Sequence, residues 1–468
     1  MSNNSQVDPA SAVLPLPPAP LNRLDRISLP VFFAVFLILA GLVVARSSLL
    51  ERRYGDWNVF ARAAWAARSG ADLYDITDDN GFHYHYPPTF ALLLAPLADA
   101  PPGAPRSGLM PYPLTVLYWY YFNLFCLGVS AHWLALAVEG SSPVWSRPDW
   151  RYSRGWWGLR LWPLLACLPP VGHTLIRGQV GMLLLLLLSG MILASVRGKS
   201  WQAGGWLAGA ICLKIIPALL LIYPLLRRDV RFLASCAAGL LLLAVAVPVA
   251  VRGPEQTWRD YQKWNQVILS PAVAGGSDTS RANELLNVTA TDSQSFLAML
   301  HNTTYLDRET RPRQASSLTR WLARLAGGTL LLAVLAASWR ALRPRGGASL
   351  PDAPATIITW GALIEVMLLA SPVCHLHYFC LSMPLVAGLM AVAWKDQTRP
   401  PLGLALSVLV VLNVAANTVP HFAGMEVWRD VGLAAYAAVG LILAAIIVLW
   451  RRPAANLAKA TLLPAKAA

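Results

Sequence analysis

The sequence predicts an all-α, polytopic membrane protein, and two observations support that prediction. Of 468 residues, 56% are hydrophobic and only 13% are charged, whereas a soluble domain has about a quarter of its residues charged. Apolar runs long enough to cross a hydrocarbon core of about 30 Å recur along the chain. They lie at residues 29–45, 113–138, 161–176, 178–196, 232–251, 321–339, 355–372, 376–394, 402–419 and 431–450. With shorter segments added, we expect a bundle of about 10–12 transmembrane helices.

The ends of the chain differ from this apolar body. Residues 1–28 are Pro-rich and are expected to form a disordered cytoplasmic N-terminus, while 451–468 form a cytoplasmic basic tail. Residues 29–450 then make a single transmembrane domain. The first apolar run lacks the small-residue exit of a cleaved signal peptide, so we expect it to remain as an anchor.

The net charge of +14 is interpreted as a topology signal, and no nucleic-acid partner is expected. Basic residues in the short loops place the N-terminus in the cytoplasm, with one conflict at 201–226, which has basic clusters at both ends. A re-entrant hairpin broken near 214–217 removes the conflict, because Pro217 interrupts a helix. A true span with an external basic loop is the alternative. The loops 46–112 and 252–320 then lie outside the cytoplasm, together with several shorter turns. Seven of the eight histidines fall in or beside these external segments.

The first external loop contains a carboxylate directly before a predicted helix. Residues 57–69 place Trp57, Phe60 and Trp65 on one face with Arg62 elsewhere, which predicts an interfacial amphipathic helix. Asp56 precedes it. The simpler interpretation, favoured by physics alone, is an N-cap. The functional interpretation is a general base held at the membrane surface.

The segment 82–88 is extended by its prolines, so alternate side chains face one way. His83 and His85 could share a metal with Asp78 or Asp79, but no third ligand has the spacing of a known motif. A sugar-binding cleft lined by aromatic and imidazole rings is the preferred hypothesis, and an aromatic interface belt is the plainest one.

Two basic residues occur where an anion could bind. Arg177 lies at the junction of two apolar runs, either as a turn with a snorkelling side chain or as an anion contact. Lys214 lies at membrane depth, where insertion costs about 2.5–3.5 kcal/mol, so it should have a partner. A lipid phosphate or the intramembrane Glu365 would serve.

Histidines follow the apolar run that contains Glu365. Glu365 should lie ~9 Å below Ser371 along a straight helix. His375 and His377 lie where the chain re-enters the membrane. Their imidazoles suit hydrogen bonding to a phosphate or sugar better than metal binding. No metal and no cofactor are expected.

The loop 252–320 is too long for an idle connector. It begins with Trp258, Tyr261 and Trp264 at helical spacing, which predicts an interfacial anchor. The sequence contains no P-loop, no Rossmann glycine pattern and no Ser-centred nucleophile elbow. A nucleotide-sugar site is therefore disfavoured, and a donor that arrives in the membrane is favoured.

These residues resemble glycosyltransferase family 87, membrane mannosyltransferases of the GT-C class that use polyprenyl-phosphate-mannose. The matching pieces occur in the family's order over about residues 50–380. They are Gly55-Asp56, Gly70 with Leu73-Tyr74-Asp75, Tyr86-Pro87-Pro88, Gly178-Gln179, Ala208-Gly209, Lys214 with Pro217, Arg227-Arg228, and Ser371-Pro372 before histidine. The sequence departs from the family pattern at His375, where Trp is expected, and at Tyr378, where His is expected.

The resemblance implies a GT-C-like bundle and an inverting hexosyltransferase in a cell membrane. The positive-inside loop pattern puts its active site on the extracytoplasmic face, and the Ala/Leu/Arg-rich composition suggests a bacterial membrane. Asp56 would be the catalytic base, and Arg177 and Lys214 would bind the donor phosphate. The donor would be polyprenyl-phosphate-linked, and the acceptor an envelope lipid or glycan. Further substrate-binding residues are expected at His85, Tyr86, Gln179, Glu365, His375 and His377.

Two other functions fit a polytopic chain. A transporter or flippase of lipid-linked sugars should have internal repeats and paired broken helices, but the sequence has one predicted break and no clear repeat. A non-catalytic scaffold of an envelope assembly would tolerate Asp56→Asn.

Overall fold

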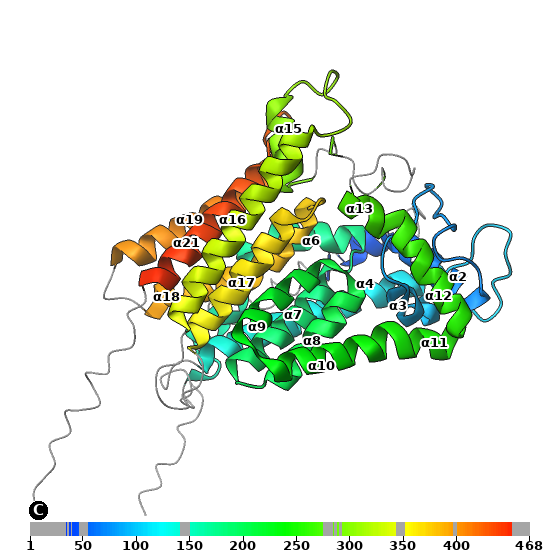
Figure 1. The fold of residues 1–468 in the computed structure, drawn as a ribbon, viewed down its shortest axis with the longest axis horizontal. Helices are drawn as coiled ribbons and strands as arrows, with labels where there is room; N and C mark the ends of the chain where they lie inside the picture. The colour runs from blue at the N-terminus through cyan, green and yellow to red at the C-terminus, as the bar shows by residue number, and fades with distance from the viewer. Residues whose placement is uncertain are drawn as a thin grey trace, which may run out of the picture.

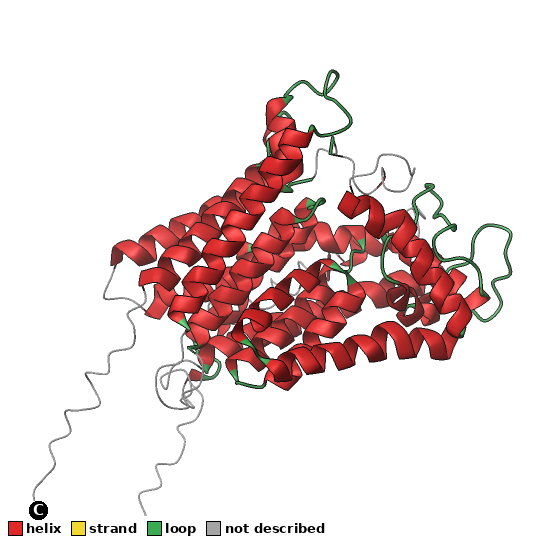
Figure 2. Ribbon diagram, in the orientation of Figure 1, coloured by secondary structure: helices red, strands yellow, loops and turns green. Residues whose placement is uncertain are grey.

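The computed structural model describes residues 34, 37–38, 40–45, 55–140, 150–274, 284, 288–289, 293–342, 352–395 and 400–451. Within them the regular structure is helical (Figure 2). The first half contains α2 (Trp57–Ser69), α3 (Pro88–Leu93), η2 (Ala95–Leu97), α4 (Tyr112–Glu139), α5 (Arg154–Ala166), α6 (Leu168–Arg177), α7 (Gly181–Val196), α8 (Ser200–Leu213), η5 (Ile216–Leu221), α9 (Ile222–Arg227), α10 (Val230–Leu240), η6 (Leu241–Ala246) and α11 (Val247–Arg252). The second half contains α12 (Pro254–Trp264), η7 (Asn265–Leu269), α13 (Ser270–Ala274), α15 (Phe296–Thr304), α16 (Ser317–Ala341), α17 (Ala353–Ala370), η8 (Leu376–Ser382), α18 (Met383–Lys395), α19 (Pro400–Thr418), η9 (Val419–His421), α20 (Glu426–Asp430) and α21 (Leu433–Arg451).

Seven helical segments in the described part of the chain are long and apolar enough to cross a membrane. Each coincides with a predicted apolar run, so the polytopic all-α class is confirmed. The predicted run 178–196 forms the shorter apolar helix α7. The run 29–45 is described only in part, and 1–28 and 452–468 lie outside the described residues. The seven segments are Tyr112–Glu139, Val230–Arg252, Ser317–Ala341, Ala353–Ala370, Leu376–Trp394, Leu402–His421 and Leu433–Arg451. The total of about 10–12 helices stays a prediction.

The predicted single span 161–176 is wrong, because two shorter helices occupy this stretch. Helix α5 ends before Cys167, whose φ of −110° and ψ of 12° leave the helical region. Pro169 and Pro170 follow in the first turn of α6. Proline is tolerated at the start of a helix but lacks the N–H that a helix interior needs. Hydropathy alone therefore joined two helices that proline chemistry divides.

Helices α8 and α9 form a hairpin whose two ends lie together. Ser200 Oγ donates a hydrogen bond of 2.7 Å to Asp229 Oδ2, so the chain enters and leaves the hairpin at one end. At the tip, Lys214 is extended, with φ −152° and ψ 130°, and Pro217 lies in the first turn of η5. Helix α10 then packs beside α8. The chain therefore forms the predicted hairpin over 201–226, and its re-entry into the bilayer stays a prediction.

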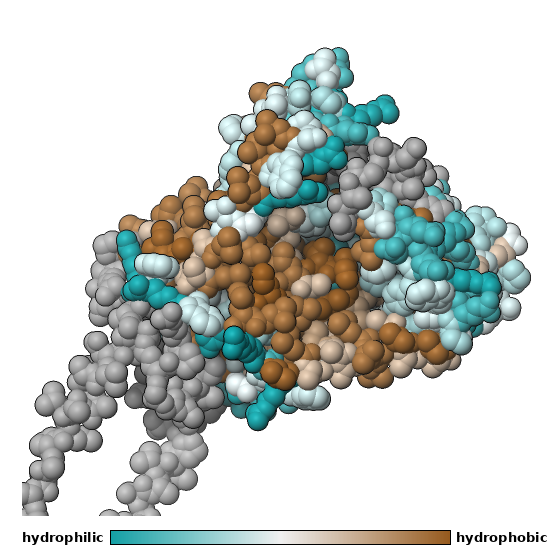
Figure 3. All heavy atoms as spheres, viewed as in Figure 1, coloured by the Kyte–Doolittle hydropathy of each residue, from teal (hydrophilic) through white to brown (hydrophobic). Residues whose placement is uncertain are grey.

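The outer surface divides into apolar and polar regions. Figure 1 shows α16, α17, α18, α19 and α21 grouped on one side, and α7, α8, α10 and α11 on the other. Figure 3 shows a hydrophobic belt over these helices, with hydrophilic residues gathered near α12 and around α15. The belt includes exposed Leu241, Leu242 and Val245 of η6. A lipid-embedded body with polar segments beyond the bilayer has this distribution.

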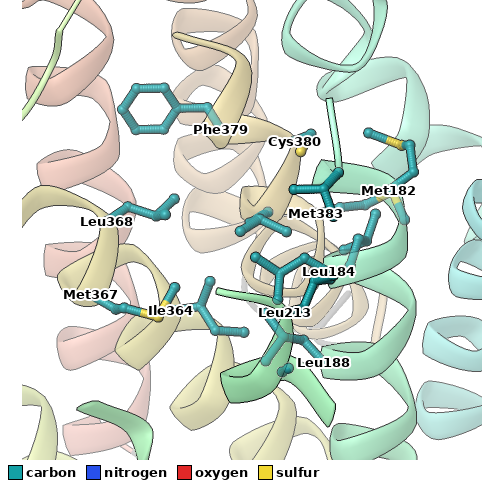
Figure 4. Close-up of a cluster of buried hydrophobic side chains, with 14 of the residues drawn as sticks. Met182, Leu184, Leu188, Leu213, Ile364, Met367, Leu368, Phe379, Cys380 and Met383 are labelled. Carbon is teal, nitrogen blue, oxygen red and sulfur yellow. The ribbon is translucent and has the colours of Figure 1, made fainter. Parts of the chain in front are cut away.

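The core lies around α17, which is buried from Ala353 to Leu369. Figure 4 shows side chains of α7, α8, α17, η8 and α18 packed in one cluster. Its labelled members are Met182, Leu184, Leu188, Leu213, Ile364, Met367, Leu368, Phe379, Cys380 and Met383. Because η8 carries His377 as well as Cys380, this packing supports one wall of the site described below.

Helix α2 forms at its predicted residues, but it packs inside the protein on nearly all sides. Ten of its residues are buried, including Trp57 and Phe60. Arg62 is 3% exposed and pairs with Asp79 at 3.0 Å and with Asp99 at 3.6 Å. The amphipathic pattern was real, but the face carrying Arg62 packs against an acidic loop instead of water.

Candidate active site

A cavity of ≈ 680 Å³ lies between α2, the loop around residues 80–87, the α6–α7 turn, the hairpin tip, η7–α13 and the segment before η8. Eight of the nine predicted site residues line it. They are Asp56, His85, Tyr86, Arg177, Gln179, Lys214, His375 and His377. Residues far apart in sequence therefore meet at one site, and its volume is that of a ligand pocket.

The position of Asp56 depends on a close backbone approach. The Asp56 N–H donates to the Arg177 carbonyl oxygen at 2.9 Å. Gly55 has φ +38°, and a Cβ at this position would lie 2.6 Å from the same oxygen. Only glycine fits such a contact without displacing the backbone. The Gly55-Asp56 pair is thus a local requirement for joining α2 to the α6–α7 turn.

The carboxylate of Asp56 is oriented by a chain of hydrogen bonds. Gln179 Nε2 donates to Asp56 Oδ2, and the Tyr86 hydroxyl donates to Gln179 Oε1 at 3.2 Å. Burial and then the charge of Asp56 hold the pKa of Tyr86 well above its usual value, despite the opposing effect of Arg177. Tyr86 therefore stays a neutral donor, which fixes the orientation of the Gln179 amide.

The N-cap interpretation of Asp56 is wrong. Its side chain makes no capping hydrogen bond to α2, and its backbone is in the α region, with φ −75° and ψ −12°. An N-cap normally has extended backbone and accepts from the second or third N–H of the helix. The carboxylate is turned to Gln179 and the cavity instead.

Two cations face the same cavity. Arg177 Nε lies 3.9 Å from Asp56 Oδ2. Lys214 Nζ lies 3.6 Å from the centre of the Tyr378 ring and 5.4 Å from that of Tyr86. Ring faces attract a cation but do not neutralise it. Of the two partners considered for Lys214, Glu365 is excluded, because no described carboxylate lies within 4.0 Å of this ammonium. The lipid phosphate stays a prediction.

His375 and His377 contribute imidazoles to the wall near Lys214. Their rings stack with centroids 5.4 Å apart, and His377 is 1% exposed. Behind it, the ring of His173 lies 5.8 Å away, and Thr174 Oγ1 donates to the His377 carbonyl at 2.9 Å. These contacts hold the turn before η8 against α6.

His83 and His85 face a residue that sequence reasoning missed. His83 Nδ1 lies 2.8 Å from Glu284 Oε1, and His85 Nε2 lies 3.6 Å from Glu284 Oε2. The predicted alternation is confirmed, since both imidazoles reach one carboxylate. Glu284 gave no signal, because it stands alone in a long polar loop.

The proposed metal ligands are not brought together. Asp78 accepts from the backbone of Asn80 and Phe82, and Asp79 pairs with Arg62. Across the described ranges, no group of three His, Cys, Asp or Glu residues has metal-binding geometry. The two histidines therefore belong to a cavity wall in which His83 hydrogen-bonds Glu284 and His85 lies 3.6 Å from it.

Glu365 is not among the residues that line the cavity, and its predicted contact with substrate stays a prediction. It lies 0% exposed within α17. Ser371 is six residues further on, which rotates its direction by about 600°, or 240°, around the helix. The predicted distance of ~9 Å between Glu365 and Ser371 took account of the rise along the helix but not of this rotation, so the two side chains point in different directions.

The segment after α11 also contributes to the cavity. Trp258 is 65% exposed, as expected of an interfacial residue. Trp264 instead is 6% exposed, lines the cavity and donates to the His85 carbonyl at 3.2 Å. The predicted aromatic anchor is therefore divided between the surface and the site.

Comparisons with known proteins find a family and several similar proteins. The profile of glycosyltransferase family 87 matches residues 84–372. A polyprenol-phosphate-mannose-dependent alpha-(1-2)-phosphatidylinositol mannoside mannosyltransferase of Mycolicibacterium smegmatis is 24% identical over 428 residues, covering 86% of this chain and 85% of that protein. The protein of the same name from Mycobacterium tuberculosis is 24% identical over 426 residues, covering 83% of each chain.

Among solved structures, the crystal structure of ArnT from Cupriavidus metallidurans in the apo state is similar, with 16% identity and a TM-score of 0.38. The match covers 90% of this chain and 78% of that one. The structure of the same protein bound to undecaprenyl phosphate has 15% identity and a TM-score of 0.39, covering 90% and 77%.

Proposed function

The chain belongs to glycosyltransferase family 87, and we propose that it transfers a hexose from a polyprenyl-phosphate donor to an acceptor hydroxyl, with inversion and with Asp56 as general base. Mannose is the proposed sugar, because the names of both curated relatives specify polyprenol-phosphate-mannose. The acceptor is proposed to be an envelope lipid or glycan.

The observation that carries this proposal is the meeting of one oriented carboxylate with two cations in a single cavity. Asp56, Arg177 and Lys214 all line it. A carboxylate within hydrogen-bond reach of a hydroxyl can accept its proton. Guanidinium and ammonium groups stabilise the charge that develops on a departing phosphate.

The proposed reaction has one transfer step. Asp56 takes the proton of the acceptor hydroxyl while the acceptor oxygen forms a bond to the anomeric carbon. The bond between that carbon and the phosphate oxygen breaks, and the electron pair leaves with polyprenyl phosphate. Arg177 and Lys214 hold the phosphate as its charge increases. Attack opposite the leaving group inverts the anomeric configuration.

Gln179 and Tyr86 support this role of Asp56. The bond from Gln179 occupies Oδ2 of the carboxylate, so Oδ1 remains available to an incoming hydroxyl. A base held in one orientation before substrate arrives needs less reorganisation during the reaction.

The extracytoplasmic location is proposed from the charge distribution. With the positive-inside arrangement, the loops 46–112 and 252–320 lie outside the cytoplasm. Both contribute to the cavity, through Asp56, Tyr86 and Trp264. The hairpin brings Lys214 to that side, while its two ends remain at the basic, cytoplasmic side.

The test is transfer of labelled mannose from synthetic polyprenyl-phosphate-mannose by purified protein in lipid, with membrane lipids and glycans as acceptors. Asp56→Asn keeps the shape of the side chain and removes the base, so we expect the rate to fall about 10²- to 10⁴-fold. Asp75→Asn is the matched control, because Asp75 pairs with Lys263 outside the cavity.

The outcomes separate the parts of the proposal. Equal rates for wild type and Asp56→Asn would reject Asp56 as the base while keeping the transferase. Transfer by neither protein, together with movement of the intact donor across the bilayer, would replace the proposal with transport.

A further inference from the structure

Glu284 is a carboxylate on the cavity wall that the proposed transfer step does not use. The His83 backbone N–H donates to Glu284 Oε2 at 3.2 Å, and His83 Nδ1 lies 2.8 Å from Oε1. Its side chain is 21% exposed and lines the cavity together with Asn80 and Trp264. The residue is thus held by one loop and presented to the cavity.

The carboxylate keeps capacity for further hydrogen bonds. Two carboxylate oxygens offer about four acceptor sites, and the two contacts from His83 occupy one on each oxygen. Partial burial raises the pKa of Glu284, but the contact with His85 and the hydrogen bonds from His83 outweigh it and bring the pKa to about 2. Glu284 is therefore ionised under ordinary conditions and can only accept hydrogen bonds, which suits hydroxyl donors and disfavours anions.

The surroundings of Glu284 differ in charge from those of the cations. Its contacts are with His83 and His85 in the segment 83–85, and Trp264 donates to that segment's backbone. Arg177 and Lys214 belong to the α6–α7 turn and the hairpin tip. The cavity therefore has a basic part that suits a phosphate and an acidic, aromatic part that suits an uncharged polyhydroxylated group.

We propose that Glu284 determines acceptor specificity by hydrogen-bonding hydroxyl groups of the acceptor's sugar and by repelling acceptors with a negative charge at that position. The inference rests on the proposed function, since it names the acceptor class of the same site. It predicts that the reacting end of the acceptor is a neutral sugar or polyol, whatever anionic groups occur farther along the molecule.

The experiment compares two probes that differ in one charge: an alkyl hexoside and the matching alkyl hexuronide. Their binding is measured on the full chain in lipid nanodiscs, with empty nanodiscs subtracted. We expect wild type to bind the hexoside at least about tenfold more tightly, because two like charges at contact distance repel in a partly desolvated site. Glu284→Gln should reduce that preference to about threefold or less.

Two further variants make the result specific. Glu284→Asp retains the charge and should retain most of the preference. Glu255→Gln is the matched control, since Glu255 lies on α12, pairs with Arg259 and has a side chain 80% exposed. It should behave as wild type in both binding and thermal unfolding.

Each outcome bears on a different proposal. An unchanged preference in Glu284→Gln, or no hexoside binding by wild type, would overturn the role of Glu284. A preference that depends on Glu284, in a protein that transfers no sugar from polyprenyl-phosphate-mannose, would support this inference and refute the proposed donor. Transfer with an unchanged preference would refute this inference alone.

Discussion

Replacing Lys214 with methionine should weaken donor binding without destabilising the protein. The ammonium lies on the faces of Tyr378 and Tyr86 and has no described carboxylate within 4.0 Å. A structural ion pair would lose stability when its cation is removed. If Lys214 instead binds the donor phosphate, its removal should lower the affinity for the donor and leave stability unchanged, so the two roles predict different results.

The expected loss of affinity follows from the charges involved. An ammonium about 4 Å from a phosphate charge gains ~4 kcal/mol at an effective dielectric constant of about 20. Arg177 remains in the variant and water replaces part of the contact. The net loss should therefore be about 2–3 kcal/mol, as for other hydrogen bonds to charged groups. This corresponds to a Kd for polyprenyl phosphate that is raised about 30- to 160-fold.

The expected effect on stability has the opposite sign. A lysine at membrane depth costs about 2.5–3.5 kcal/mol, and its contacts with aromatic rings return only about 0.5–2 kcal/mol. Methionine has a similar length without the charge. The Tm of Lys214→Met should therefore equal or exceed that of wild type.

The assay measures displacement of a labelled polyprenyl phosphate, with thermal unfolding recorded on the same samples. Lys199→Met is the control, because Lys199 is exposed at the other end of α8 and does not line the cavity. A lowered Tm with unchanged Kd would refute the reasoning and make Lys214 a structural residue.

Three other predictions follow from the same contacts. Tyr86→Phe removes the hydrogen bond to Gln179, so kcat should fall about 5- to 10-fold, equivalent to ~1 kcal/mol, with the donor KM unchanged. An unaltered kcat in steady-state assays would show that the Gln179 amide is oriented without the Tyr86 hydroxyl. Gly55→Ala should cost about 1–3 kcal/mol of stability and abolish transfer, because a Cβ there meets backbone at 2.6 Å. Gly328→Ala is the control and should keep its activity, because Gly328 lies within α16 and its Cβ would meet nothing within 4 Å. The pKa of Glu284 is lowered from 4.5 to about 2, so its contribution to stability is complete above about pH 4.5 and lost as pH falls towards 2. The Tm difference between wild type and Glu284→Gln should therefore shrink over that window. A constant difference would contradict the contacts of Glu284 with His83 and His85.

Much of the fold was predictable because lipid imposes a simple rule. A helix that crosses a bilayer needs a long apolar run, so hydropathy located all seven spanning segments of the described chain. The hairpin was predictable for a different reason, since basic clusters at both ends forced the chain to return. The break at Cys167 was missed, because Pro169 and Pro170 interrupt a run whose hydropathy is continuous.

The site was predictable only where a residue type is unusual for its position in the sequence. A lysine at membrane depth and a glycine–aspartate pair before a helix are unusual enough to be noticed, and Lys214 and Asp56 line the cavity. Glu365 was equally unusual, but its direction depends on rotation along α17. Glu284 carried no local signal, because its importance comes from a contact with His83, 201 residues away in sequence.

The position of the proposed base depends on three elements that lock together through buried bonds. Asp56 is bonded through its backbone to Arg177, and the next residue, Gly178, accepts a hydrogen bond of 2.7 Å from Trp119 of α4. The Trp119 ring stacks on Trp57 of α2 at 5.0 Å, which closes a loop of contacts back to the residue after Asp56. Displacement of any one element would therefore strain the other two. A carboxylate held in this way has its geometry set before substrate binds, which is the condition under which a general base and its neighbouring cations are most effective.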